Sequence, residues 1–164
     1  MANPYRQIFQ ALSDAEIRYL IVGGVAVNLH GYRRFTADID ILLALDEENL
    51  EKMTMLMQQL GYIEHLPIAL RALSDAEKVQ RFLDEKGMTA YTFLSEKRDR
   101  LDIDVLAGKS LRFQEYEKRK VMVNVEGGLS VPVISIDDLL EMKKEAHRPD
   151  DLRDIEALLA LKGL

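Results

Sequence analysis

Two periodicities of apolar and polar residues run along the chain, and together they predict helices and strands. Residues 47–60 place five apolar side chains on one helical face, and Gly61 ends that helix. Residues 38–44 begin with strict alternation of acidic and apolar side chains, which is typical of a strand. Further helices are predicted over residues 4–12, 25–30, 112–119, 136–146 and 150–162, and further strands over 18–22, 89–94, 100–106, 120–126 and 129–134.

Two short signals lie outside this periodicity. Ser74 and Glu77 have the spacing of a capping box and predict a helix that ends at Gly87. The segment Ala-Leu-Ser-Asp-Ala-Glu occurs twice, at 11–16 and 72–77, but the flanking sequences differ. We interpret the repetition as helix-end chemistry or coincidence rather than as an internal repeat.

The order of the elements predicts the fold class. Helices and strands alternate, and Gly127-Gly128 joins two strands in a hairpin near the end of the chain. Ser135 and Asp138 then cap a helix, and the part from about 136 to 162 is helical. This order favours an α/β or α+β fold with a mixed β-sheet flanked by helices. The length of 164 residues favours one domain, residues 1–164.

Composition narrows the classes of function. The chain has no cysteine, which excludes disulfides and a thiolate zinc site, and its three histidines stand at unrelated positions. No apolar run approaches the length of a membrane span and no signal peptide is evident, so we expect a soluble, cytoplasmic protein. The formal net charge is −6. Nucleic acid would therefore have to meet a local basic patch or be held through bound metal ions.

Acidic residues in two predicted strands are the first candidates for chemistry. Asp38 and Asp40 are two residues apart, so both side chains leave the same face of a strand. Asp102 and Asp104 repeat this arrangement in the predicted strand 100–106. Taken alone, the pair Asp38 and Asp40 is equally well explained as a solvated strand edge. If the two strands are neighbours, one acid of the second completes a three-carboxylate cluster suited to Mg²⁺ or Mn²⁺.

Glycine and arginine residues near the first acidic strand favour phosphate as a ligand. Gly23 and Gly24 lie between a strand and a short helix, where bare backbone approaches phosphate closely. The loop that follows contains Arg33 and Arg34, which either steer a triphosphate or form a solvated pair. An isolated Gly-Gly pair would be an ordinary turn. The order strand, Gly-Gly, helix, basic loop, acidic strand favours the functional interpretation.

These motifs resemble a known family. An apolar residue with Gly-Gly, then Asp-apolar-Asp, then a later apolar-Asp-apolar strand is similar to the nucleotidyltransferase fold shared with DNA polymerase β. More narrowly, the runs 23–26, 31–40, 135–143 and 148–155 resemble bacterial AbiEii-like and minimal nucleotidyltransferases of toxin–antitoxin systems. The resemblance covers roughly residues 18–44 and 100–160 and leaves 61–99 unmatched. It implies C-terminal helices packed on the sheet.

The resemblance implies roles for individual residues. Gly23 and Gly24 would contact the phosphates of the donor, and Asp38 and Asp40 would bind both metal ions. Asp104 aligns best with the third acid. Asp102 is the alternative to Asp104 in that place. Many members of the family have Gly-Ser where this chain has Gly-Gly.

The resemblance also implies an activity. A nucleoside monophosphate would pass from an NTP to an acceptor hydroxyl on RNA, tRNA or a protein, with Mg²⁺ or Mn²⁺ as cofactor. Lys143 either extends to solvent or aims its amine at a nucleotide phosphate or an acid of the site. Arg148, Asp151 and Asp154 are predicted to form an ion pair or cap between the last helices. The alternative function is an inactive nucleotide-binding or regulatory partner with the same fold.

Overall fold

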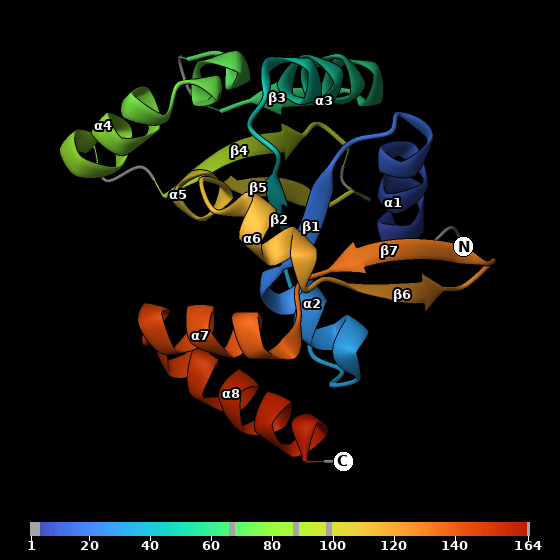
Figure 1. Cartoon of the computed structure of the whole chain (residues 1–164). Coiled ribbons are helices and arrows are strands. Elements are labelled where there is room, and N and C mark those ends of the chain that lie inside the picture. The colour runs from blue at the N-terminus through green and yellow to red at the C-terminus, as the bar shows by residue number, and fades with distance from the viewer. Residues whose placement is uncertain (1–3, 66–67, 87–88, 98–99, 164) are drawn as a thin grey trace.

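The computed structural model describes residues 4–65, 68–86, 89–97 and 100–163. Figure 1 shows a central sheet flanked by helices. The helices are α1 (Pro4–Asp14), α2 (Gly23–His30), α3 (Glu47–Leu60), α4 (Ala76–Lys86), α5 (Ala107–Ser110), α6 (Phe113–Lys118), α7 (Ile136–Ala146) and α8 (Pro149–Lys162), with the 3-10 helix η1 (Leu70–Ser74) before α4. The strands are β1 (Tyr19–Val22), β2 (Asp38–Leu43), β3 (Tyr62–Glu64), β4 (Ala90–Ser95), β5 (Asp102–Leu106), β6 (Val121–Val125) and β7 (Leu129–Val133).

The described strands form one mixed sheet in the order β3-β4-β5-β2-β1-β7-β6. Strand β2 pairs antiparallel with β1 and parallel with β5, and β1 is also parallel to β7. Strands β3, β4 and β5 are joined in antiparallel pairs, as are β6 and β7. The predicted fold class, a mixed sheet flanked by helices, is confirmed.

Local signals explain why several elements end where they do. Asp46 caps α3 by accepting a hydrogen bond from the backbone N–H of Asn49, and Gly61 ends the helix in the left-handed conformation. The Ser135 hydroxyl caps α7 by accepting from the N–H of Asp138. The carboxylate of Asp138 instead pairs with Arg119, so only half of the predicted capping arrangement forms.

The core lies along the two central strands and the helices packed on them. Leu20, Ile21 and Val22 of β1 are fully buried, as are Ile39 and Ile41 of β2. Helices α7 and α8 pack on each other and both contact α2, whereas η1 contacts α3 and α4. Figure 1 shows the pair α7–α8 below the sheet and α3, η1 and α4 above it. The C-terminal helices therefore lie next to α2.

Some sequence predictions are wrong in detail. The helix predicted to start at residue 25 begins at Gly23, directly after β1. Asp75 rather than Ser74 caps α4, because its carboxylate accepts from the N–H groups of Glu77 and Lys78. The predicted helix end at Gly87 lies outside the described residues. Strand β3, η1 and α5 have no counterpart among the predictions.

The repeated segment Ala-Leu-Ser-Asp-Ala-Glu adopts two different structures. At 11–16 it ends α1, and at 72–77 it spans the end of η1 and the start of α4. This outcome supports helix-end chemistry over an internal repeat. Among the helices of the described ranges, none combines the length and the apolar composition that crossing a membrane requires.

Candidate active site

The two acidic strands are direct neighbours in the sheet. Asp38 lies opposite Asp102 and Asp40 lies opposite Asp104 in the parallel pair of β2 and β5. Adjacent strands are about 4.8 Å apart, and residues two apart share a face. The structure therefore brings four acidic positions to one face of the neighbouring strands β2 and β5.

Burial, and after it mutual repulsion, raises the pKa of two of these acids. The pKa of Asp40 is raised to about 7, first by burial and then by the charges of Asp104 and Asp38. Lys143 and Arg148 act in the opposite direction on the pKa of Asp40. The pKa of Asp38 is also raised, by burial and by the nearby carboxylates. Without a cation between them, the negative charges of these carboxylates repel each other, and each disfavours the ionised form of its neighbours.

Asp104 and Asp102 differ in their surroundings. Asp104 accepts a 2.6 Å hydrogen bond from the hydroxyl of Thr92 on β4, and it acts on the pKa of both Asp38 and Asp40. Asp102 accepts a 2.8 Å hydrogen bond from the backbone N–H of Ser95. Each of the two acids thus accepts one hydrogen bond from β4, but the charge of Asp104 raises the pKa of both Asp38 and Asp40, whereas that of Asp102 raises the pKa of Asp38.

Gly23 brings the backbone of α2 directly against Asp40. It has a φ of 65°, and a Cβ at this position would overlap the Asp40 carboxylate and come within 2.9 Å of its Cγ. A Cβ on Gly24 would lie 2.9 Å from both Arg34 Nη1 and Thr36 Oγ1. The first glycine therefore borders the acids, whereas the second is enclosed by the loop that leads into β2.

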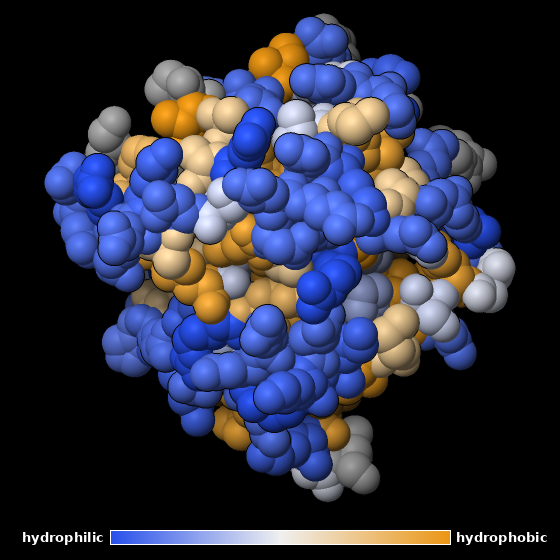
Figure 2. Space-filling view, turned by 45° about the horizontal axis from the view of Figure 1, so that its top comes forward, coloured by the Kyte–Doolittle hydropathy of each residue, from blue (hydrophilic) through white to orange (hydrophobic). Residues whose placement is uncertain are grey.

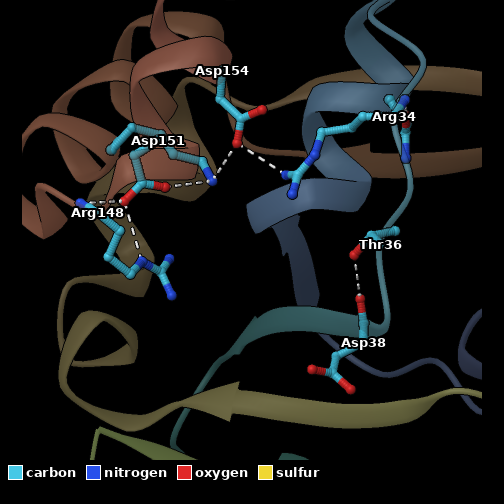
Figure 3. Close-up of polar contacts among 8 residues, drawn as sticks. Arg34, Thr36, Asp38, Arg148, Asp151 and Asp154 are labelled. Carbon is cyan, nitrogen blue, oxygen red and sulfur yellow. Dashed lines mark hydrogen bonds and ion pairs between the residues drawn. The ribbon is translucent and has the colours of Figure 1, made fainter.

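A buried lysine and two buried aspartates, together with two arginines, link that loop to the last two helices (Figure 3). Lys143 is 6% exposed, and its Nζ lies 3.1 Å from Asp151 Oδ1 and 2.9 Å from Asp154 Oδ2. Asp154 also binds Arg34 Nη1 at 2.9 Å. Asp151 accepts from both the backbone N–H and the Nε of Arg148, each at 3.1 Å. We call these five residues the buried ion network.

Arg148 is the member of this network that reaches the surface. Its side chain is 72% exposed, and it contacts Asp151 through the backbone N–H and Nε. Within the described part of the chain, no residue forms a hydrogen bond or ion pair with its two Nη groups. Arg33, on the loop before β2, is also exposed.

A cleft of about 690 Å³ adjoins the acids. Gly23, Asp40, Asp104, Lys143 and Arg148 all line it. It continues between α7 on one side and α4 and α5 on the other. One end of the cleft thus combines carboxylates, cations and bare backbone, the groups that a metal-bound triphosphate requires.

A family model decides the classification. The model described as "Nucleotidyltransferase of unknown function (DUF6036)" matches residues 5–163. The chain belongs to this nucleotidyltransferase family. No curated protein is significantly similar to the chain.

Solved structures of other nucleotidyltransferases share the fold. The lincosamide antibiotic adenylyltransferase LnuA, bound to lincomycin, has a TM-score of 0.65 and 18% identity, covering 98% of each chain. An antigenic nucleotidyltransferase-like protein from Paracoccidioides brasiliensis has a TM-score of 0.60 and 18% identity over 94% of this chain and 73% of its own. ANT(2'')-Ia in complex with adenylyl-2''-tobramycin has a TM-score of 0.53 and 15% identity over 95% of this chain and 86% of its own.

Sequence reasoning placed the acids of this nucleotidyltransferase and Gly23 together but missed two neighbours. Thr92 was not singled out, although its hydroxyl holds Asp104. Arg148 was assigned only to the ion pair, which the structure confirms, yet it also lines the cleft. Arg148 and Asp151 are three residues apart at the start of a predicted helix. This spacing indicates the contact between the Asp151 carboxylate and the Nε of Arg148. The predicted phosphate contacts of Arg33, Arg34, Lys143 and Gly24 stay predictions.

The close approach of Gly23 to Asp40 predicts a specific defect. In Gly23→Ala, the added Cβ displaces the Asp40 carboxylate, so we expect nucleotidyl transfer to fall at least tenfold and stability to fall by about 1–3 kcal/mol. Gly128→Ala is the matched control, because it has a φ of 79° and no heavy atom within 4 Å of its Cβ. Urea unfolding and a transfer assay measure both effects. Equal transfer by the two variants would show that the Gly23–Asp40 contact is unimportant.

Proposed function

We propose that the protein transfers a nucleoside monophosphate from an NTP to an acceptor hydroxyl, with Mg²⁺ or Mn²⁺ held by Asp38, Asp40 and Asp104. One observation carries this proposal. Asp40 and Asp104 stand opposite each other on β2 and β5, beside the bare backbone of Gly23. Membership in a nucleotidyltransferase family supports the reaction type.

The carboxylates suit a hard cation that shares its ligands with the substrate. Within the described ranges, no group of three or more histidine, aspartate or glutamate side chains is already arranged to hold a metal ion. Mg²⁺ needs only one or two carboxylates, because phosphate oxygens and water complete its octahedron. The pKa of Asp40 is raised first by burial and then by the charges of Asp104 and Asp38, and a bound cation favours the ionised carboxylate against both effects. When bound, such ions lower the pKa of the attacking hydroxyl and neutralise charge on the leaving pyrophosphate.

The remaining groups bind and orient the two substrates. The N–H groups at the start of α2 and the exposed guanidinium of Arg148 hold the triphosphate, and the buried amine of Lys143 adds positive charge beside the same cleft. Asp104 receives the proton of the acceptor hydroxyl, and Thr92 keeps its carboxylate in place. We favour Asp104 over Asp102 as the third acid because Asp104 and Asp40 line the same cleft.

The acceptor and the biological setting are further parts of the proposal. An AbiEii-like role in a bacterial toxin–antitoxin system, in the cytoplasm and with residues 1–164 acting as one domain, is the alternative in which RNA, tRNA or a protein is the acceptor. Two structural neighbours are adenylyltransferases whose complexes contain lincomycin and adenylyl-2''-tobramycin, respectively. Such relatives support a hydroxyl acceptor and ATP as donor for this chain as well.

Transfer of label tests the proposed function. The protein is incubated with each α-³²P NTP, Mg²⁺ or Mn²⁺, and cell extract, and pyrophosphate release is followed. We expect metal-dependent release together with labelled acceptor, and a loss of roughly 10²–10⁴-fold in Asp104→Asn. NTP binding without release under every condition favours the inactive nucleotide-binding alternative. Full activity in Asp104→Asn contradicts the assignment of that residue.

A further inference from the structure

The cleft extends beyond the acids, and its far end is apolar. It passes from Asp40 and Asp104 to Thr89 and Ala90, where β4 begins. Six apolar side chains from α4, the end of β5, the segment after α5, and α7 line this end: Leu83, Leu106, Leu111, Leu139, Met142 and Ala146. The same elements and α5 also contribute four polar lining residues to this end, Gln80, Lys109, Arg112 and Glu145. We call this part the apolar end of the cleft. Figure 2 shows apolar surface between two hydrophilic regions of the face it draws.

The order of the strands gives the cleft a direction. Gly23 follows β1, Asp40 lies on β2, Asp104 lies on β5 and Ala90 lies on β4, and these four strands are consecutive in the sheet. Glycine backbone therefore stands at one end of the cleft, the carboxylates in the middle, and the apolar end beyond them.

In-line displacement at phosphorus assigns the two ends to different substrates. The attacking and leaving oxygens lie on opposite sides of the phosphorus atom. The proposed function places the leaving pyrophosphate beside Gly23 and the α-phosphorus above the acids. The attacking hydroxyl must then arrive from the side of β5 and β4, which is where the apolar end begins.

We propose that the apolar end of the cleft binds the acceptor, and that the acceptor is a small organic alcohol with an apolar body. This inference rests on the proposed function. The acceptor oxygen forms a bond to the α-phosphorus, and the bond from that phosphorus to the bridging oxygen of pyrophosphate breaks. The hydroxyl proton passes to Asp104. The products are a nucleoside monophosphate ester of the alcohol and pyrophosphate.

Size and charge favour a small alcohol over a macromolecule. The whole cleft has a volume of about 690 Å³, within the range of pockets for drug-sized molecules. Lys109 of α5 pairs with Glu145 of α7, and Arg112, which also lines the cleft, pairs with Glu115, so both cations already have an acidic partner. RNA would need a basic track, and the protein has a formal net charge of −6. A ligand that enters the apolar end gains from removing its own apolar surface from water.

A pair of tryptophan variants on α7 tests the proposal. Met142 is half-buried in the wall of the apolar end, so Met142→Trp fills that end. Glu141 is its exposed neighbour, and Glu141→Trp is the matched control. The probes are benzyl alcohol and cyclohexylmethanol, with glycerol as a polar comparison, in the presence of Mg²⁺ and α,β-methylene-ATP. Saturation-transfer NMR measures alcohol binding, and calorimetry measures nucleotide binding.

We expect the wild type and Glu141→Trp to bind the two apolar alcohols more strongly than glycerol. Met142→Trp should lose at least tenfold in alcohol binding while its nucleotide affinity stays within twofold. The proposal would be overturned if the wild type bound no alcohol. It would also be overturned if Met142→Trp lost tenfold in nucleotide affinity, because the nucleobase would then occupy this end of the cleft. Label from α-³²P NTP appearing on RNA or protein would also overturn it. A wild type that binds no nucleotide would instead refute the proposed function.

Discussion

Asp40→Asn is expected to abolish nucleotidyl transfer and, at the same time, to stabilise the metal-free protein. The loss of transfer should be at least about 10³-fold, because the variant lacks a carboxylate at the centre of the acid cluster. The gain in stability follows because the ionised form of Asp40 is disfavoured in the folded protein: burial first, and then the charges of Asp104 and Asp38, raise the pKa of Asp40 to about 7. An amide of the same shape carries no such charge. Active-site residues often lower the stability of the folded protein in this way.

The stability difference has a defined pH dependence. The ordinary pKa of the Asp40 carboxyl is 3.8. Between about pH 4 and pH 7 the folded protein keeps a proton that the unfolded chain releases, so Asp40 lowers stability progressively as the pH rises through this window. Relative to wild type, Asp40→Asn should therefore gain little at pH 4 and on the order of 2–4 kcal/mol at pH 8. Urea unfolding without divalent metal, at pH 4, 6 and 8, measures this difference.

Asp102→Asn is the matched control for Asp40→Asn. It also exchanges a carboxylate for an amide on the same face, and an amide oxygen can still accept from the N–H of Ser95. We expect this variant to retain transfer within a few-fold. An Asp40→Asn protein that transfers normally, or one that is less stable than wild type at pH 8, contradicts our account of the acids.

Removing Lys143 is expected to produce the largest loss of stability. Its amine lies between Asp151 and Asp154, which are 2% and 1% exposed. In Lys143→Met these buried carboxylates keep only their arginine partners, so unfolding should become easier by about 3–5 kcal/mol at pH 7. Lys144→Met, at the exposed position beside it, should change stability by no more than about 0.5 kcal/mol. Urea unfolding of both variants checks the comparison.

The pH dependence separates this effect from a simple packing defect. Burial raises the pKa of Asp151, but hydrogen bonds from Lys143 and Arg148 outweigh it and leave the pKa below its ordinary value of 3.8. Asp151 therefore contributes stability above that pH, and the contribution disappears as the pH falls through the lowered pKa. The loss in Lys143→Met should shrink as the pH approaches 3. A loss that is constant from pH 7 to pH 3 would indicate packing alone.

Local patterns explain which parts of the fold could be predicted. Helix α3 has the predicted bounds because Gly61 ends it, and the side chain of Asp46 satisfies its first turn. The acids share a face because strand periodicity is two, and this follows from Asp38 and Asp40 alone. Strand β3 is only three residues long, too short for a pattern, and its pairing with β4 depends on distant residues.

Contacts between distant segments were beyond sequence reasoning. Arg34 and Asp154 are 120 residues apart, and nothing local indicates that they pair. Lys143 lies on an apolar stripe, where extension to solvent is the usual outcome, yet it is buried by two acids from the next helix. Which of Asp102 and Asp104 faces Asp40 depends on the register of β2 and β5, which local spacing leaves undetermined.

Anomalous X-ray scattering from Mn²⁺ tests the central claim most directly. Crystals of the protein would be grown with Mn²⁺ and α,β-methylene-ATP, and the metal positions located from the manganese signal. We predict at least one peak coordinated by Asp40 and shared with Asp38 or Asp104, with the triphosphate beside Gly23. Nucleotide bound elsewhere, or manganese found only away from these three carboxylates, would contradict the proposed site.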